Sequence, residues 1–138
     1  MSDQPDFSGI WRADFERSRL EIEVPSSTVI RIEHEEPAFV LTRTHAAGDV
    51  RDVFSVRLVT DGRETVSRKD SAEILTRCAW EGASLSFHSR ILSGGTEATN
   101  VVVYKLSPDG GELVADETYQ GPPKSYHNTW VLVRDERG

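Results

Sequence analysis

Three side chains near the C-terminal end could contact a bound molecule together. Tyr126, Asn128 and Trp130 alternate along the chain, so on a β-strand they point to the same face. Their hydroxyl, amide and indole groups can hydrogen-bond a ligand held against that face, or can be satisfied by neighbouring backbone. We interpret all three as candidate ligand-binding residues.

Acid–base chemistry is available from Glu117, His45 and Tyr126, which are catalytic candidates only if the protein is an enzyme. Glu117 lies in the middle of an alternating segment, and burial there would raise its pKa and suit it to general acid or base work. His45 precedes a turn and titrates near neutral pH. The structural alternatives are an ion pair between Glu117 and Arg43, and a solvated His45.

The histidine and cysteine patterns predict no metal site, and we expect no cofactor. The histidines at positions 34, 45, 88 and 127 lack the close spacing of metal ligands. The single cysteine, Cys78, excludes an internal disulfide. We expect it to be a buried structural thiol, because no base adjoins it. No nucleotide-binding loop or nucleophile elbow occurs.

Size and charge narrow the class of protein. The chain has 138 residues, of which 37% are hydrophobic and 28% charged, which predicts a single domain over residues 1–138. A net charge of −7 without a basic run argues against a nucleic-acid partner. Apolar runs are too short for membrane insertion. The polar start lacks a signal peptide, so we expect a cytoplasmic protein, either a monomer or a homodimer.

Regular turn signals divide the chain into about ten segments rich in β-branched and aromatic residues. The expected strands are residues 9–16, 28–34, 38–44, 50–60, 63–68, 72–80, 84–92, 97–106, 112–120 and 125–134. The best helical candidate, residues 17–24, is short and stops at Pro25. Short connections favour an all-β, antiparallel up-and-down β-barrel of about 8–10 strands, with little or no helix, over a Greek-key sandwich.

Several turn and strand motifs carry a family resemblance. They are Phe7-Ser8-Gly9-Ile10-Trp11, Asp61-Gly62-Arg63-Glu64, Trp80-Glu81-Gly82 and Leu106-Ser107-Pro108-Asp109-Gly110. With these motifs the chain resembles small bacterial lipocalin-like proteins of the calycin superfamily, which includes lipocalins and fatty-acid-binding proteins. The resemblance implies a barrel that holds a small, mostly apolar molecule, with Trp11 plugging the closed end beneath Arg134.

The chain also departs from relatives within that superfamily. Residues 16–28 are too few for the helical lid of fatty-acid-binding proteins. The Arg-x-Tyr that those proteins carry near the C-terminus is absent, and Tyr126-x-Asn128 lies in its region.

Alternation from Trp11 and Arg134 predicts which side chains line the barrel lumen. The resulting ligand-binding candidates are Arg43, Phe87, Trp80, Tyr104, Tyr119, Tyr126, Asn128 and Trp130. The strand that holds Tyr104 is apolar on both faces, so alternation does not orient it.

Two functions fit this lumen. One is binding of a small apolar or amphipathic molecule, whose polar group Arg43 or Tyr126 would orient. The alternative is a cofactor-independent enzyme, such as a cyclase, isomerase or lyase of natural-product biosynthesis. Such an enzyme would shape its substrate inside the barrel with one or two acid/base residues.

Overall fold

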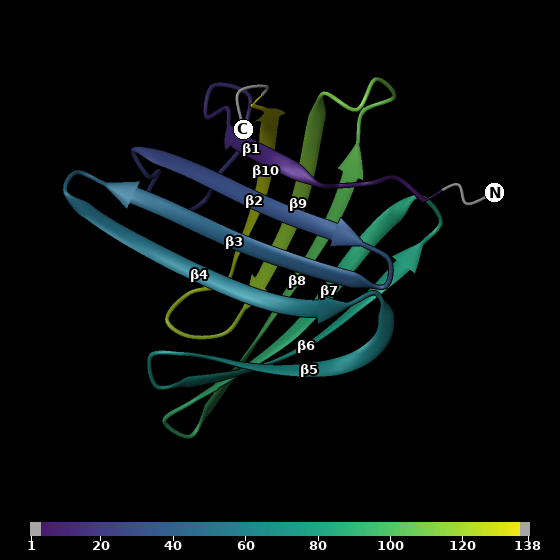
Figure 1. Cartoon of the computed structure of the whole chain (residues 1–138). Helices are drawn as coiled ribbons and strands as arrows, with labels where there is room; N and C mark the ends of the chain where they lie inside the picture. The colour runs from purple at the N-terminus through teal and green to yellow at the C-terminus, as the bar shows by residue number, and fades with distance from the viewer. Residues whose placement is uncertain (1–3, 136–138) are drawn as a thin grey trace.

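The expected strands form one antiparallel sheet that curls into a nearly closed barrel (Figure 1), which confirms the predicted fold class. The computed structural model describes residues 4–135, and within that range it contains no helix. The strands are β1 (Gly9–Ala13), β2 (Ser27–Glu35), β3 (Ala38–Ala47), β4 (Val50–Val59), β5 (Asp61–Lys69), β6 (Ala72–Glu81), β7 (Ser84–Ser93), β8 (Thr96–Leu106), β9 (Glu112–Gln120) and β10 (Tyr126–Arg134).

The barrel closes through pairing of its first and last strands, and among the described strands it lacks backbone pairing only between β4 and β5. The sheet order is β4-β3-β2-β1-β10-β9-β8-β7-β6-β5, so β1 pairs with β10 and the edges of β4 and β5 are unpaired. The turn signal at Thr60-Asp61-Gly62-Arg63 separates β4 from β5, but the two strands do not pair as a hairpin. At this corner the Thr60 N–H donates to the Pro37 carbonyl at 2.9 Å, which ties the chain to the β2–β3 turn.

Aromatic side chains fill one end of the barrel. Trp11 is fully buried there, with Phe7 and Phe39, and its indole N–H donates to the Phe7 carbonyl at 2.9 Å. The Arg134 guanidinium lies 4.3 Å above the Trp11 ring and donates to the Ser8 carbonyl at 2.6 Å. This is the packing that the family resemblance implies for Trp11 and Arg134.

The conformation of Gly9 explains why a glycine lies two residues before the buried Trp11. Its φ is +139°, a value that side-chain-bearing residues rarely adopt. A Cβ atom at this position would lie 2.5 Å from Nη1 of Arg134. The backbone conformation therefore favours glycine, and a larger residue would also displace the Arg134 guanidinium.

Residues 14–26, here called the strap, connect β1 to β2 and form no helix at 17–24, the best helical candidate in the sequence. Arg19 and Thr129 exchange two backbone hydrogen bonds of 2.8 Å. Leu20 and Ile22 pack against the core, while Glu21 between them is exposed. A single backbone bridge at Arg19 and bends at residues 21 and 22 stand where a helix would otherwise lie.

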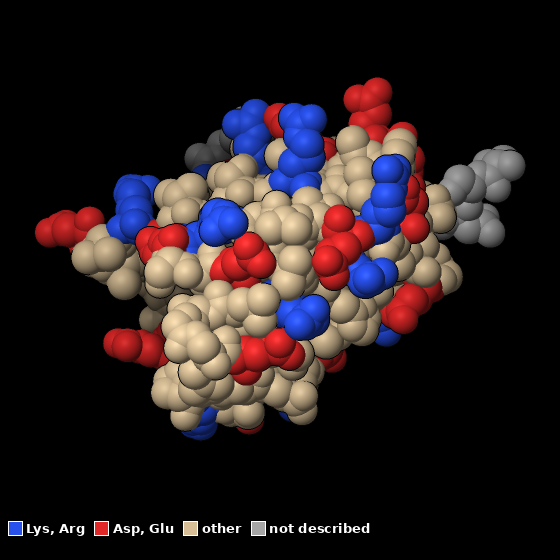
Figure 2. Space-filling model, turned by 90° about the horizontal axis from the view of Figure 1, so that it is seen from below, with Lys and Arg blue, Asp and Glu red and all other residues tan. Residues whose placement is uncertain are grey.

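The outer surface mixes both signs of charge. On the face in Figure 2, acidic and basic side chains are interspersed, and neither sign dominates. Among the described residues, no helix is long and apolar enough to cross a membrane.

Candidate functional site

Two adjoining cavities occupy the lumen. The larger, here called the main cavity, measures about 260 Å³, and the smaller, the side cavity, about 150 Å³ and reaches Ile22 of the strap. Both are lined by Arg43, Val102, Tyr104, Glu117 and Tyr126. Together they lie at the lower end of the range of about 300–1,000 Å³ that small-molecule sites occupy.

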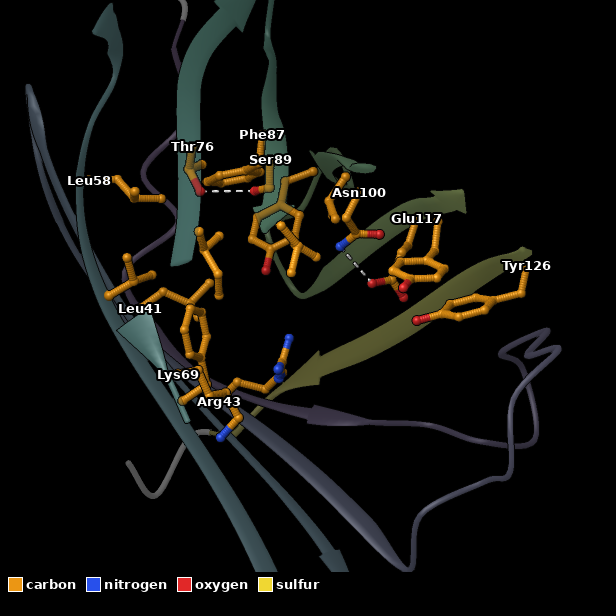
Figure 3. A pocket seen from close by; sticks show the side chains of 17 residues that line it. Leu41, Arg43, Leu58, Lys69, Thr76, Phe87, Ser89, Asn100, Glu117 and Tyr126 are labelled. Carbon is orange, nitrogen blue, oxygen red and sulfur yellow. Dashed lines mark hydrogen bonds between the residues drawn. The ribbon is translucent and has the colours of Figure 1, made fainter. Parts of the chain in front are cut away.

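The wall of the main cavity is mostly apolar, with a few polar groups (Figure 3). Its apolar lining comes from Leu41, Phe54, Val56, Leu58, Ile74, Phe87, Ile91 and Val102. Thr76 and Ser89 face each other across β6 and β7, and their hydroxyls are hydrogen-bonded at 2.9 Å. Such a wall favours an apolar body, and its polar atoms can orient that body.

Glu117 is held by three side-chain donors. Its Oε1 accepts from Nδ2 of Asn128 and Nε1 of Trp130, each at 3.0 Å. Its Oε2 accepts from Nδ2 of Asn100 at 3.0 Å. Within the described part of the chain no ion pair joins Glu117 to Arg43, so the amides and the indole fix this carboxylate in place.

Arg43 projects into the main cavity from β3 (Figure 3). Its guanidinium carbon lies 5.3 Å from the centre of the Phe54 ring. Its Nε–H is buried and has no hydrogen-bond partner. Among residues 4–135, no carboxylate forms an ion pair with this guanidinium.

His45 lines the side cavity as a neutral ring. Its ring stacks on the Trp130 ring, with 5.7 Å between the ring centres. A 2.7 Å hydrogen bond joins its Nδ1 to Oγ1 of Thr28. Burial lowers the pKa of His45 to about 4, and the nearby charge of Arg43 acts in the same direction. At neutral pH the imidazole therefore carries no charge.

Two tyrosines stand together beside the carboxylate. The rings of Tyr119 and Tyr126 stack with 4.8 Å between their centres. The Tyr119 hydroxyl donates to the Pro122 carbonyl at 2.7 Å. Burial raises the pKa of Tyr126 to about 12, and the negative charge of Glu117 adds to the effect. Tyr126 therefore keeps its proton and can donate it in a hydrogen bond.

Lys69 joins the cavity wall to the unpaired edges of the sheet. It lines the main cavity, and its Nζ lies 2.6 Å from Oδ1 of Asp52. The same Nζ donates to the Val53 carbonyl at 3.2 Å. This side chain of β5 therefore bridges to β4 across the line where backbone pairing is missing.

Most of the predicted site residues meet at the cavities. The structure places Arg43, Phe87, Tyr104, Glu117, Tyr119 and Tyr126 around the main cavity, and His45 and Trp130 around the side cavity. Trp80 points inward as predicted but lies at the filled end, where its indole donates to Oε1 of Glu36 at 3.0 Å. Asn128 is fully buried and contacts Glu117 rather than a cavity.

Phe54, Lys69 and Asn100 are among the lining residues that the sequence reasoning missed. Asn100 carried a usable signal, since it is a polar residue within an apolar strand. Phe54 lies on β4 and Lys69 on β5. For these two strands the sequence analysis did not predict which side chains face the lumen.

The remaining chemical candidates of the sequence lie apart from the cavities. Cys78 is buried, and desolvation raises its pKa to about 12, which keeps the thiol protonated and unreactive. Within residues 4–135, no three side chains of the His, Cys, Asp and Glu types are grouped closely enough to hold a metal ion.

Comparison with known proteins supports the fold. A secretory abundant heat soluble protein 4 from Ramazzottius varieornatus is similar, with 13% identity, a TM-score of 0.63 and coverage of 99% of this chain and 100% of that chain. Zebrafish ileal bile acid-binding protein in complex with cholic acid has 16% identity, a TM-score of 0.63 and coverage of 94% and 98%. A second secretory abundant heat soluble protein from R. varieornatus has 14% identity, a TM-score of 0.64 and coverage of 96% and 98%.

At these identities the likeness concerns the fold alone. No protein-family model matches the chain, and no curated protein matches it in sequence.

Proposed function

We propose that the protein binds a small apolar or amphipathic molecule in the two adjoining cavities. The observation that carries the proposal is a lumen of about 260 Å³ and 150 Å³ with mostly apolar walls. Each 100 Å² of apolar ligand surface removed from water contributes about 2.5 kcal/mol. The zebrafish neighbour, a bile acid-binding protein crystallised with cholic acid, supports a small-molecule ligand for a barrel of this fold.

A neutral fluorescent dye, N-phenyl-1-naphthylamine, tests the proposal. Val102 lines both cavities, so Val102→Phe fills the space that a ligand needs. Val103, the next residue of β8, points to the other face of the sheet, and Val103→Phe is the matched control. We expect the dye to bind one-to-one and to lose at least about tenfold in affinity in Val102→Phe only.

Two results would contradict the proposal. One is the absence of saturable dye binding to the wild-type protein. The other is equal binding by the two variants, provided that both show the wild-type circular dichroism spectrum. If the dye binds as expected, native mass spectrometry of protein purified from its source, followed by denaturing extraction, would identify the natural ligand.

A catalytic function has one supporting observation. His45, Glu117 and Tyr126 all line the side cavity, so a neutral base, a carboxylate and a phenol donor face the same space. Incubation with a metabolite extract, followed by mass spectrometry, tests this second candidate. A product made by the wild type and lost in Glu117→Gln would support it, and unchanged profiles would count against it.

The cytoplasmic location and the monomeric or homodimeric state remain part of the proposal. Light scattering of the purified protein measures the assembly state directly.

A further inference from the structure

Two polar atoms of opposite kind lack partners at the main cavity. The Nε–H of Arg43 is a buried donor without an acceptor, and Oδ1 of Asn100 is a buried acceptor without a donor. Both residues line the same cavity. Since buried polar groups in folded proteins are almost always paired, this pair indicates groups that the chain itself does not supply.

The orientation of the Asn100 amide is fixed by its neighbour. Its Nδ2 donates to Oε2 of Glu117 at 3.0 Å, as the dashed line in Figure 3 shows. Exchanging the amide atoms would set two acceptors against each other, with a carboxylate as one of them. Oδ1 therefore stays an acceptor, and its missing partner is an O–H or N–H group.

Arg43 is the lumen cation without a counter-ion among the described residues. Lys69 is paired with Asp52 at 2.6 Å, and Glu117 is already bound to three neutral donors. His45 is neutral at pH 7. A guanidinium in this position matches the planar, two-oxygen geometry of a carboxylate.

We infer that the bound molecule is an amphipathic acid with an additional hydroxyl or N–H group. Its acid group binds Arg43, its additional donor binds Oδ1 of Asn100, and its apolar body contacts the wall that contains Phe54 and Phe87. This inference rests on the proposed function, because it assumes that a ligand occupies the main cavity. An amine without an acid group is disfavoured, since Arg43 and Lys69 would repel it.

Matched ligands with ten carbons test the inference by displacing N-phenyl-1-naphthylamine. The set is decanoate, decan-1-ol, and the 2-hydroxy and 3-hydroxy forms of decanoate. We expect decanoate to bind about ten- to a hundredfold more tightly than decan-1-ol, the usual range for a hydrogen bond to a charged group. At least one hydroxy acid should bind more tightly than decanoate.

Two variants assign these preferences to residues. Arg43→Met should remove the preference for the acid over the alcohol, while Arg57→Met, the same change at an exposed position of β4, should keep it. Asn100→Leu should remove the gain from the hydroxyl group and keep the preference for the acid.

The inference and the proposed function fail in different ways. Equal affinities for decanoate and decan-1-ol in the wild type, with the dye still bound, would overturn the inference alone. An unchanged acid preference in Arg43→Met, or an unchanged hydroxyl gain in Asn100→Leu, would also overturn it. Absence of dye binding would overturn both. The wild-type comparison is decisive even if a variant does not fold.

Discussion

Replacing Gly9 with alanine tests the packing of the filled end of the barrel. A Cβ atom at position 9 would lie 2.5 Å from Nη1 of Arg134, closer than the two atoms can approach. The guanidinium would have to leave the Trp11 ring and the Ser8 carbonyl. The backbone would also keep a φ of +139°, which alanine disfavours.

The expected loss of stability follows from these contacts. A residue with a Cβ atom in a left-handed conformation costs about 1–2 kcal/mol. Loss of the charged hydrogen bond from Arg134 to Ser8 costs about 1.5–3 kcal/mol, and loss of the cation–π contact with Trp11 about 0.5–2 kcal/mol. Gly9→Ala should therefore lower the free energy of unfolding by about 3–7 kcal/mol.

Urea denaturation followed by tryptophan fluorescence measures the effect. With a slope of about 2 kcal/mol per molar urea, the midpoint should fall by roughly 1.5–3.5 M. Gly48→Ala is the matched control, because Gly48 has a φ of +61° and nothing within 4 Å of the added Cβ. Its cost should be only the backbone part, about 1–2 kcal/mol.

A double-mutant cycle separates the clash from the backbone effect. In an Arg134→Ala background, Gly9→Ala should cost about 1–2 kcal/mol, because the guanidinium is already gone. If Gly9→Ala costs the same with and without the guanidinium, the steric reasoning is refuted. If it costs no more than Gly48→Ala, the contacts of Arg134 contribute nothing to stability.

Four further outcomes are expected. The pKa of His45 is lowered from 6.5 to about 4, so the unfolded chain takes up this proton first and stability falls as pH drops from about 6.5 to about 4. An NMR titration of His45 with a midpoint near 6.5 would contradict this. Asn128→Ala should cost about 2–4 kcal/mol in urea denaturation, because Glu117 loses a donor and the Glu21 N–H, now 2.8 Å from Oδ1, loses its acceptor. His127→Ala, on the exposed face of β10, should cost much less. Lys69→Met should speed hydrogen exchange at β4 and β5 and the release of bound dye, with little change in stability, because an ion pair this exposed contributes about 1 kcal/mol or less. Arg68→Met, which breaks the surface ion pair with Glu73, should not change dye release. Cys78 should react with a thiol reagent at pH 8 only after unfolding, since burial raises its pKa to about 12, and rapid reaction of the folded protein would show that the thiol is accessible.

The strands and many inward rows were predictable because turn residues and a period of two are local properties. On β10 the sequence placed Asn128 and Trp130 inward, and both are buried. On β8 the run Val101-Val102-Val103 is apolar on both faces, so only the three-dimensional packing shows that Val102 faces the lumen.

Depth along the barrel was not predictable from alternation. Trp80 and Thr76 share the inward face of β6, yet Thr76 lines the cavity and Trp80 lies at the filled end. The line between β4 and β5 was equally hidden, since Asp61-Gly62 is typical of a hairpin. The sheet order and the hydrogen bond from Thr60 to Pro37 show that the chain turns a corner there.

Because backbone pairing is missing between β4 and β5, the barrel wall resists widening less there than between its other strands. Widening the barrel between any other two neighbouring strands would break a ladder of backbone hydrogen bonds. Widening it between β4 and β5 breaks only side-chain contacts, among them the bridge from Lys69 to Asp52 and Val53. The lumen can therefore widen for a larger ligand by separating β4 from β5. The aromatic packing around Trp11 keeps the filled end of the barrel at a fixed width.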